Sequence, residues 1–169
     1  VTPRMTEQLG QNIIIDNRTG ANNIIGTEIV ARSPADGYTL LTTAGAHTIN
    51  PSMYRKLPYD TARDFSGASL LYTLKAVVVT ASTFPANDIH SVVQLARSRP
   101  ESFSITSAFT GSIPHLLAEL FKRHHVLSTP YIFYKDSTSA QNDVSTGRVA
   151  IMFDILPGAL PQIRSGRMK

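Results

Sequence analysis

The sequence predicts an α/β fold with a largely parallel sheet. Short apolar runs rich in β-branched residues alternate with longer segments in which apolar residues recur every three or four positions. These two patterns are typical of buried strands and amphipathic helices. Several of the apolar runs end in small, polar, glycine-bearing loops. With 169 residues, 42% of them hydrophobic, the chain is long enough for one ordinary domain or two small lobes.

The first half of the chain contains four short apolar runs and two helical segments, separated by strong turn signals such as Ser33-Pro34-Ala35-Asp36-Gly37. Residues 50–65 carry Pro51 and Pro58 and predict a long connection with one helical turn. The expected elements are, in order, the tail of a helix over 1–10, a strand at 13–15, a helix from 19 to about 32, and strands at 39–42, 68–72 and 76–80.

The second half alternates more regularly. A helix begins after Asp88 and is closed by Pro100, and Pro114 begins a helix with one apolar stripe. The remaining expected elements are strands at 103–106, 131–134 and 149–153 and helices at 137–146 and 156–164. We place the boundary between two lobes near residues 100–104, which gives a first lobe over 1–103 and a second over 104–169.

Composition excludes several classes of function. The chain has no cysteine, so disulfides, thiolate metal sites and cysteine nucleophiles are excluded. The net charge of +4 comes from scattered lysine and arginine, unlike the clustered basic surface of nucleic-acid-binding proteins. No apolar run approaches the ~20 residues of a membrane span. His124 and His125 have no partners at metal-ligand spacing, so we expect neither a metal nor a cofactor.

Two glycine-bearing loops are the best candidates for a ligand site, because the carboxyl ends of parallel strands meet at one sheet edge. Small residues allow a ligand close to the backbone, and helix N-termini offer N–H donors that suit a carboxylate. Ordinary capped strand–helix turns are the alternative, and the residues alone favour that interpretation. The candidate residues in these loops are Thr43, Ala44, Gly45 and His47 in the first, and Ser107, Ala108, Thr110, Gly111 and Ser112 in the second.

Three side chains are open to a binding or a structural interpretation. His47 either donates to an anion or packs in the loop, and Tyr134 either offers its phenol to the site or is a half-buried strand aromatic. Asp154 ends a predicted strand, where it accepts from a ligand hydroxyl, an amino group or a water, or caps the following helix. His115, one residue after Pro114, is expected to pack or cap rather than bind.

The chain resembles the Bug-type extracytoplasmic solute receptors, the substrate-binding components of tripartite tricarboxylate transporters. The resemblance runs from end to end, and its motifs are specific only in combination. They are Leu9-Gly10-Gln11 with Asp16-Asn17-Arg18-Thr19-Gly20-Ala21, Asp36-Gly37-Tyr38-Thr39-Leu40-Leu41, Asn50-Pro51-Ser52-Met53-Tyr54, Leu57-Pro58-Tyr59-Asp60, Asp64-Phe65, Gly111-Ser112, Pro114-His115-Leu116, Glu119-Leu120-Phe121, Tyr134-Lys135, Met152-Phe153-Asp154 and Leu156-Pro157.

The resemblance implies a type II periplasmic-binding-protein fold, with two lobes of mostly parallel sheet and a ligand cleft between them. It implies capture of a small organic anion (a di- or tricarboxylate or an aromatic acid) for the permease subunits of a tripartite tricarboxylate transporter in the periplasm. It implies no catalysis, and we expect a monomer. In the family a strand and a Pro/Gly-rich loop precede the segment that begins at Val1, and further strands follow the last helix, so we expect the chain to be truncated at both ends.

The sequence also departs from the family pattern. Phe109 stands where glycine is common, Asn22-Asn23 replaces a Gly-Gly pair, and Phe133 and Asp136 replace proline and glycine beside Tyr134-Lys135. Three alternatives to transport stay open: a ligand sensor of the same fold, a non-functional fragment, and a hydrolase. For a hydrolase, Thr110-Gly111-Ser112-Ile113 only superficially resembles a nucleophile elbow.

Overall fold

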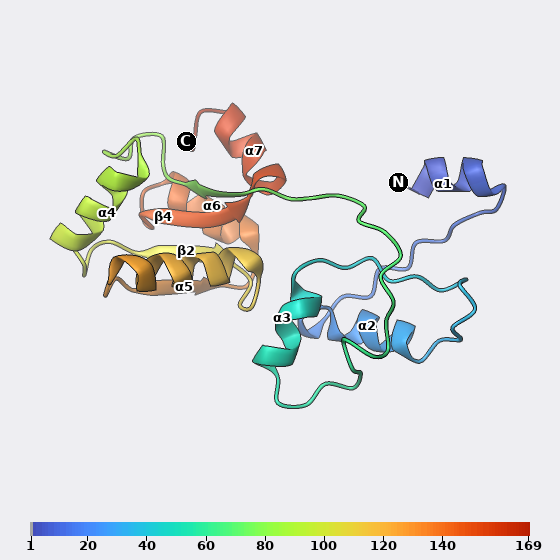
Figure 1. Ribbon diagram of the computed structural model, residues 1–169. Coiled ribbons are helices and arrows are strands. Elements are labelled where there is room, and N and C mark those ends of the chain that lie inside the picture. The colour runs from blue at the N-terminus through green and yellow to red at the C-terminus, as the bar shows by residue number, and fades with distance from the viewer. Residues whose placement is uncertain (1) are drawn as a thin grey trace. The chain divides into compact units, whose positions relative to one another are not determined.

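The computed structural model describes residues 2–169, which form two compact units that divide between Thr73 and Leu74. Each unit has its own contacts and is described separately (Figure 1). The second unit contains every strand in the described part of the chain and provides most of its buried core.

The second unit is built on a four-stranded sheet in the order β1-β4-β2-β3. Its strands are β1 (Ala76–Val79), β2 (Ile105–Ala108), β3 (Tyr131–Tyr134) and β4 (Ile151–Ile155). The pairs β2–β3 and β2–β4 are parallel, whereas β1 runs antiparallel to β4. The sheet is therefore mixed but mostly parallel, which confirms the predicted α/β class.

Helices cover both faces of this sheet. They are α4 (Ile89–Ser98), α5 (Ile113–His125), α6 (Ser137–Ser145) and α7 (Leu156–Arg164). On one face, Ile105 and Phe153 pack with Val92 of α4 and Ala118 of α5. The other face has a separate core of buried side chains from β1, β2, β4, α6 and α7, among them Val79, Ala108, Met152, Ala140, Val144 and Ala159. Burial on both faces explains why β2 and β4 are buried along almost their whole length rather than at alternate residues.

Short polar side chains begin three of these helices. Asp88, Ser112 and Asp136 are the N-caps of α4, α5 and α6, and each accepts a hydrogen bond from a backbone N–H in the first turn. The Ser139 N–H holds the pKa of Asp136 below its usual range. Asp136, a departure from the family pattern, is therefore used as a helix cap.

The first unit is made of helices and irregular chain. Its helices are α1 (Thr2–Leu9), the short 3₁₀ helix η1 (Ala21–Asn23), α2 (Ile24–Ala31) and α3 (Ala46–Met53). Asn50, which is fully buried in α3, accepts from the Asn22 side chain at 2.8 Å and donates to the Asn22 carbonyl at 3.0 Å. Asn22 and Asn23 both have positive φ, at 52° and 69°, a conformation that asparagine tolerates better than most residues.

The strands predicted at 13–15, 39–42 and 68–72 are wrong for the described chain. No strand forms between residues 2 and 73. Ile14, Leu40 and Leu70 are 90%, 63% and 80% exposed. A strand is stable only when its backbone groups pair with a neighbour, and these segments have no partner strand among the described residues. These apolar segments therefore remain irregular in the described chain.

The division between the units does not coincide with the lobe boundary expected at residues 103/104. Strand β1 pairs with β4, and Val92 and Ala96 of α4 share a core with β2. Residues 74–103 therefore pack with the second unit, although the sequence pattern groups them with the preceding helices. The extent of each lobe in a complete receptor stays a prediction.

Val126, at the C-terminus of α5, has a strained left-handed backbone conformation that a substitution can test. Val126 follows the helix with φ 54° and ψ 51°, and its side chain is 87% exposed. A β-branched residue in this left-handed region costs roughly 1–2 kcal/mol, and glycine adopts it freely at an entropic cost of roughly 0.5–1 kcal/mol. We expect Val126→Gly to raise the free energy of unfolding by about 0.5–1 kcal/mol in urea denaturation. A loss of stability would contradict the left-handed conformation.

Candidate functional site

The structure brings the candidate residues of the second unit to one edge of its sheet. Strands β2, β3 and β4 are parallel, so their carboxyl ends meet there. Ala108 is the register partner of Tyr134, and Asp154 follows Phe153, the partner of Ser107. The loop 109–112 leaves the same edge and leads directly into α5. This edge, with the loop and the first turn of α5, is called the loop-109 edge below.

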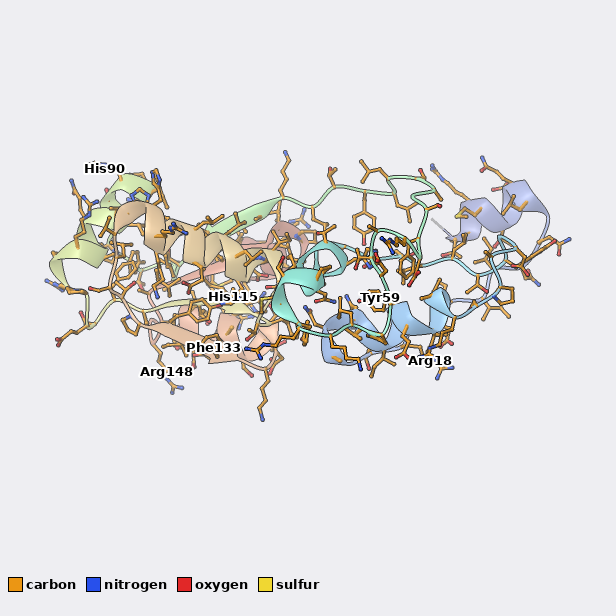
Figure 2. The ribbon with its side chains drawn as sticks, turned by 60° about the horizontal axis from the view of Figure 1, so that its bottom comes forward. Arg18, Tyr59, His90, His115, Phe133 and Arg148 are labelled. Carbon is orange, nitrogen blue, oxygen red and sulfur yellow. The ribbon has the colours of Figure 1, made fainter. Side chains whose placement is uncertain are left out.

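His115 holds the loop of this edge. Its Nδ1 accepts a hydrogen bond from the Gly111 N–H at 3.0 Å, so the ring proton lies on Nε2. The ring packs on Tyr131, with 5.0 Å between the ring centroids, and lies 6.0 Å from the Phe133 ring. Figure 2 labels His115 and Phe133. The expectation that His115 packs rather than binds therefore agrees with its contacts.

Two further features shape the same loop. The Ser112 hydroxyl donates to the Ala108 carbonyl at 2.9 Å and accepts from the His115 N–H at 3.3 Å. Phe109 and Gly111 both have positive φ, at 59° and 78°. Phe109 therefore has a backbone conformation that only glycine adopts without strain.

Protein contacts leave a small set of uncharged donors at the loop-109 edge. Gly111 and Ser112, predicted as ligand donors, use the Gly111 N–H and the Ser112 hydroxyl within the protein. Within residues 2–169, the N–H groups of Phe109, Thr110 and Ile113 and the Thr110 hydroxyl donate to no protein acceptor. Thr110 is exposed, and these groups lie at the N-terminus of the 13-residue helix α5. Such donors suit an anion, because the helix dipole favours negative charge there.

The hydroxyls of Ser107 and Tyr134 form hydrogen bonds with other side chains of the protein. Ser107 is only 1% exposed and shares a short hydrogen bond with the Tyr131 hydroxyl, whose pKa is raised by burial. The Tyr134 hydroxyl donates to Asp143 Oδ2 at 2.6 Å, and burial together with this carboxylate raises the pKa of Tyr134 to about 12. These contacts favour the structural interpretation of both side chains.

Asp154 is a buried carboxylate, 3% exposed, at the end of β4. Its Oδ1 accepts from the Ile155 N–H at 2.8 Å, and its Oδ2 accepts from Gln141 Nε2 at 2.8 Å. It makes no side-chain cap of α7, whose N-cap is Ile155. Sequence reasoning missed Gln141 and Asp143, the partners of Asp154 and Tyr134. Ala140, Gln141 and Val144 are buried on one side of the mostly polar helix α6, but their spacing in the sequence does not tell which side chains they contact.

The first-unit candidates lie at the start of α3, which sequence reasoning did not predict as a helix. The His47 N–H donates to the Ala44 carbonyl at 3.1 Å, and the Thr43 hydroxyl is 3.5 Å from the same carbonyl. Within residues 2–169, the N–H groups of Ala44, Gly45 and Ala46 donate to no protein acceptor. This helix start therefore also leaves backbone donors open.

His47 belongs to an aromatic cluster in the first unit. Its ring centroid lies 4.8 Å from that of Phe65 and 6.1 Å from that of Tyr59. Three buried polar atoms in this segment have no hydrogen-bond partner, namely His47 Nδ1, the Tyr59 hydroxyl and Thr61 Oγ1. Burial lowers the pKa of His47, so the ring is neutral at pH 7 and supplies no positive charge to an anion.

This lowered pKa has a measurable consequence. The unfolded chain binds a proton at His47 more readily than the folded protein, since the folded pKa is below the usual 6.5. The contribution of neutral His47 to the free energy of unfolding is fully present above about pH 6.5. It is lost as the pH falls through the lower pKa of His47 in the folded protein. We expect His47→Gln to flatten the decrease in the free energy of unfolding between about pH 7 and pH 5. Urea denaturation across this range measures the slope, and an unchanged slope would contradict the burial of His47. His125, whose pKa is lowered mainly by burial, contributes with the same sign.

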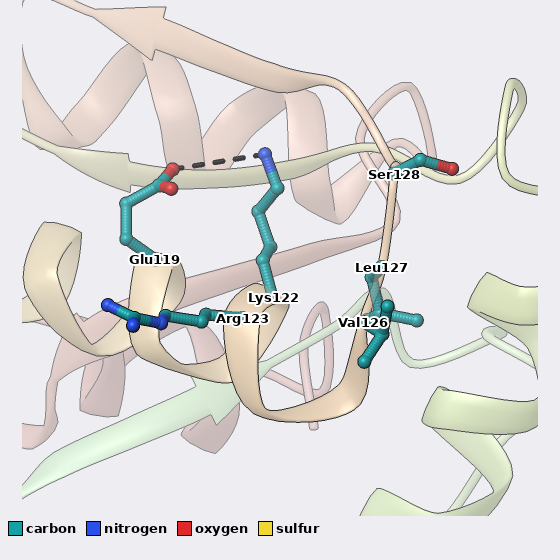
Figure 3. Close-up of a pocket in the computed structure, with 6 residues that line it drawn as sticks. All are labelled: Glu119, Lys122, Arg123, Val126, Leu127 and Ser128. Atoms are coloured by element: carbon teal, nitrogen blue, oxygen red, sulfur yellow. Dashed lines mark ion pairs between the residues drawn. The ribbon is translucent and has the colours of Figure 1, made fainter.

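One surface hollow lies elsewhere, at the C-terminus of α5 (Figure 3). It has a volume of about 440 Å³ and is lined by Glu119, Lys122, Arg123, Val126, Leu127 and Ser128. Lys122 Nζ is 3.9 Å from Glu119 Oε1. None of the candidate residues lines it, so it is separate from the loop-109 edge.

The described residues contain no group of three or more histidine, cysteine, aspartate or glutamate side chains that could hold a metal ion. Among the helices of the described chain, none is long and apolar enough to cross a membrane.

Comparisons with known proteins identify the family. The model of the tripartite tricarboxylate transporter family receptor matches residues 1–169. Protein BugT from Bordetella pertussis is 31% identical over 167 residues, which cover 98% of this chain and 51% of that protein. A UPF0065 protein from the tcbD-tcbE intergenic region of Pseudomonas sp. strain P51 is 31% identical over 169 residues, which cover all of this chain and 50% of that protein. The chain thus spans about half the length of these relatives.

Solved structures agree with this match. Rpa4515 of R. palustris with adipate has a TM-score of 0.85 and 32% identity, covering 99% of this chain and 56% of that chain. MatC from Rhodopseudomonas palustris with bound malate has a TM-score of 0.79 and 26% identity, covering 99% and 57%. The periplasmic binding protein BugD has a TM-score of 0.80 and 27% identity, covering 99% and 56%. The chain belongs to the receptor family of the tripartite tricarboxylate transporters.

Proposed function

We propose that this chain is the ligand-binding part of an extracytoplasmic receptor that captures a small organic carboxylate without chemical change. The observation that carries the proposal is the set of open, uncharged donors at the loop-109 edge, namely the N–H groups of Phe109, Thr110 and Ile113 and the Thr110 hydroxyl. A carboxylate accepts several short hydrogen bonds, and the helix dipole adds to their strength. Two solved relatives, Rpa4515 with adipate and MatC with bound malate, support this ligand class.

The first unit has its own group of open donors, at the start of α3. The N–H groups of Ala44, Gly45 and Ala46 at the start of α3 are open in the same way. These donors suit a carboxylate for the same reason as those of the loop-109 edge. Such a ligand is held without a buried cation, which avoids the cost of desolvating a second charge.

The contacts of the candidate nucleophile favour binding over hydrolysis. A serine nucleophile needs a base that accepts its proton, whereas the Ser112 hydroxyl donates to the Ala108 carbonyl. His115 Nδ1 accepts from the Gly111 N–H, so that nitrogen is not available as a base. We therefore propose a receptor with no enzymatic step. Delivery to a membrane permease and a periplasmic location follow from the family and are part of the same proposal.

Thermal denaturation of the purified protein with a panel of carboxylates tests this function. Adipate, malate, citrate and benzoate cover dicarboxylates, a hydroxy acid, a tricarboxylate and an aromatic acid. A ligand at 100 times its Kd stabilises the folded state by about 2.7 kcal/mol, so Tm rises by several degrees. Uncharged amides of the same acids are the control and are expected to leave Tm unchanged. If no carboxylate raises Tm, the proposal fails.

A further inference from the structure

Asp154 is the one buried carboxylate of the described chain, and it has no cationic partner. The five ion pairs of the described residues all involve other acids. Burying an ionised carboxylate is costly unless hydrogen bonds replace its hydration. The Ile155 N–H and the Gln141 side-chain amide supply these bonds, one to each carboxylate oxygen.

Gln141 is built into the protein around this carboxylate. It is 7% exposed, and its Nε2 lies 2.8 Å from Asp154 Oδ2, 3.1 Å from the Gly158 carbonyl and 3.2 Å from Ser137 Oγ. Rotating the amide by half a turn would place its oxygen against a carboxylate and a carbonyl, so these two acceptors fix its orientation. One side chain thus connects α6, the end of β4 and the first turn of α7.

We propose that Gln141 is a positioning residue for the ligand site, holding the Asp154 carboxylate in one orientation at the loop-109 edge. A carboxylate has about four acceptor positions, and Gln141 and Ile155 occupy one on each oxygen. The remaining positions then have fixed directions, available to a ligand hydroxyl or ammonium group or to a bridging water. This inference rests on the proposed function, because it assumes that Asp154 takes part in binding.

Gln141→Leu removes the amide while nearly preserving the side-chain volume. Without its donor, Asp154 is held by a single hydrogen bond and gains rotational freedom. We expect the affinity of the protein for malate, whose hydroxyl can donate to Asp154, to fall about tenfold when measured by calorimetry. The matched control is Asn142→Leu, the same kind of change at the next, exposed position of α6, which should leave affinity unchanged. Gln141→Met is the second variant if the leucine variant does not fold.

A double-mutant cycle with Asp154→Asn separates positioning from a merely structural role. If Gln141 acts through the carboxylate, Gln141→Leu lowers affinity in the wild-type background and has less than a twofold effect in the Asp154→Asn background. Equal effects in both backgrounds, or an unchanged affinity, would overturn the inference.

The same four proteins are also compared by urea denaturation without ligand. This measurement tests the Gln141–Asp154 interaction even if the proposed function fails. If the wild-type protein binds none of the carboxylates, the proposed function fails. In that case non-additive unfolding midpoints would still support the Gln141–Asp154 pair, and additive ones would contradict it.

Discussion

Ile105→Ala is expected to lower the free energy of unfolding by about 3 kcal/mol. Ile105 lies at the start of β2, is fully buried, and packs with Phe153, Ala118 and Val92. Replacing such a side chain with alanine removes its transfer free energy and leaves a cavity, which together cost about 2–5 kcal/mol. Strand β2 also pairs with both β3 and β4, so it positions the loop-109 edge.

Urea denaturation monitored by circular dichroism measures this loss. Leu120→Ala is the matched control, since Leu120 lies on the outer side of α5 and is 60% exposed. Its substitution is expected to change the free energy of unfolding by less than about 0.5 kcal/mol. Similar losses for the two variants would show that β2 is not at the centre of the core.

Thr110→Asp is expected to weaken carboxylate binding by about 100-fold. Thr110 is exposed at the loop-109 edge, among the open N–H donors at the start of α5. A carboxylate placed there occupies those donors itself and repels an anionic ligand, and like charges in contact cost several kcal/mol. A 100-fold change in Kd corresponds to about 2.7 kcal/mol.

Isothermal titration calorimetry with adipate or malate measures this change. Ser102→Asp is the matched control, because Ser102 is also exposed but precedes β2 at the opposite end of the strand. It adds the same charge and is expected to leave Kd within about twofold. Equal losses for the two variants would point to the net charge of the protein rather than to the loop.

The sequence predicts the second unit well because its local patterns and its packing agree. Strand β3 and helix α7 begin and end where the sequence predicts, and β1 is one residue shorter. Strands β2 and β4 each begin and end two residues later than predicted. Phe103 and Val149 are buried just before these strands. The apolar pattern therefore indicated which residues are buried, not which residues pair by hydrogen bonds in the sheet.

The first unit could not be predicted in the same way. Runs such as 13–15 and 39–42 have strand composition, but strand formation depends on a partner elsewhere in the chain. Helix α3 was missed for a different reason, since Pro51 lies inside it and proline usually interrupts a helix. Burial of Ile49 and Asn50 stabilises this helix in spite of the proline.

The sequence predicted which candidate residues of the second unit share a sheet edge, but not how their side chains pair. Loops after apolar runs indicated where Ala108, Tyr134 and Asp154 meet, because parallel strands share a carboxyl edge. Side-chain pairing was hidden, since the partners Gln141 and Asp143 come from a separate helix. The sequence left Tyr134 open between a ligand contact and a structural role, and the structure adds the bond from its hydroxyl to Asp143.

The central claim is that uncharged backbone donors at the loop-109 edge bind the carboxylate. Titrating the ¹⁵N-labelled protein with adipate and following its amide resonances tests this claim most directly. We predict saturable downfield shifts of the Phe109, Thr110 and Ile113 amide protons, because each forms a charge-assisted hydrogen bond. Saturable shifts confined to the hollow around Lys122 and Arg123, or no shift at all, would contradict it.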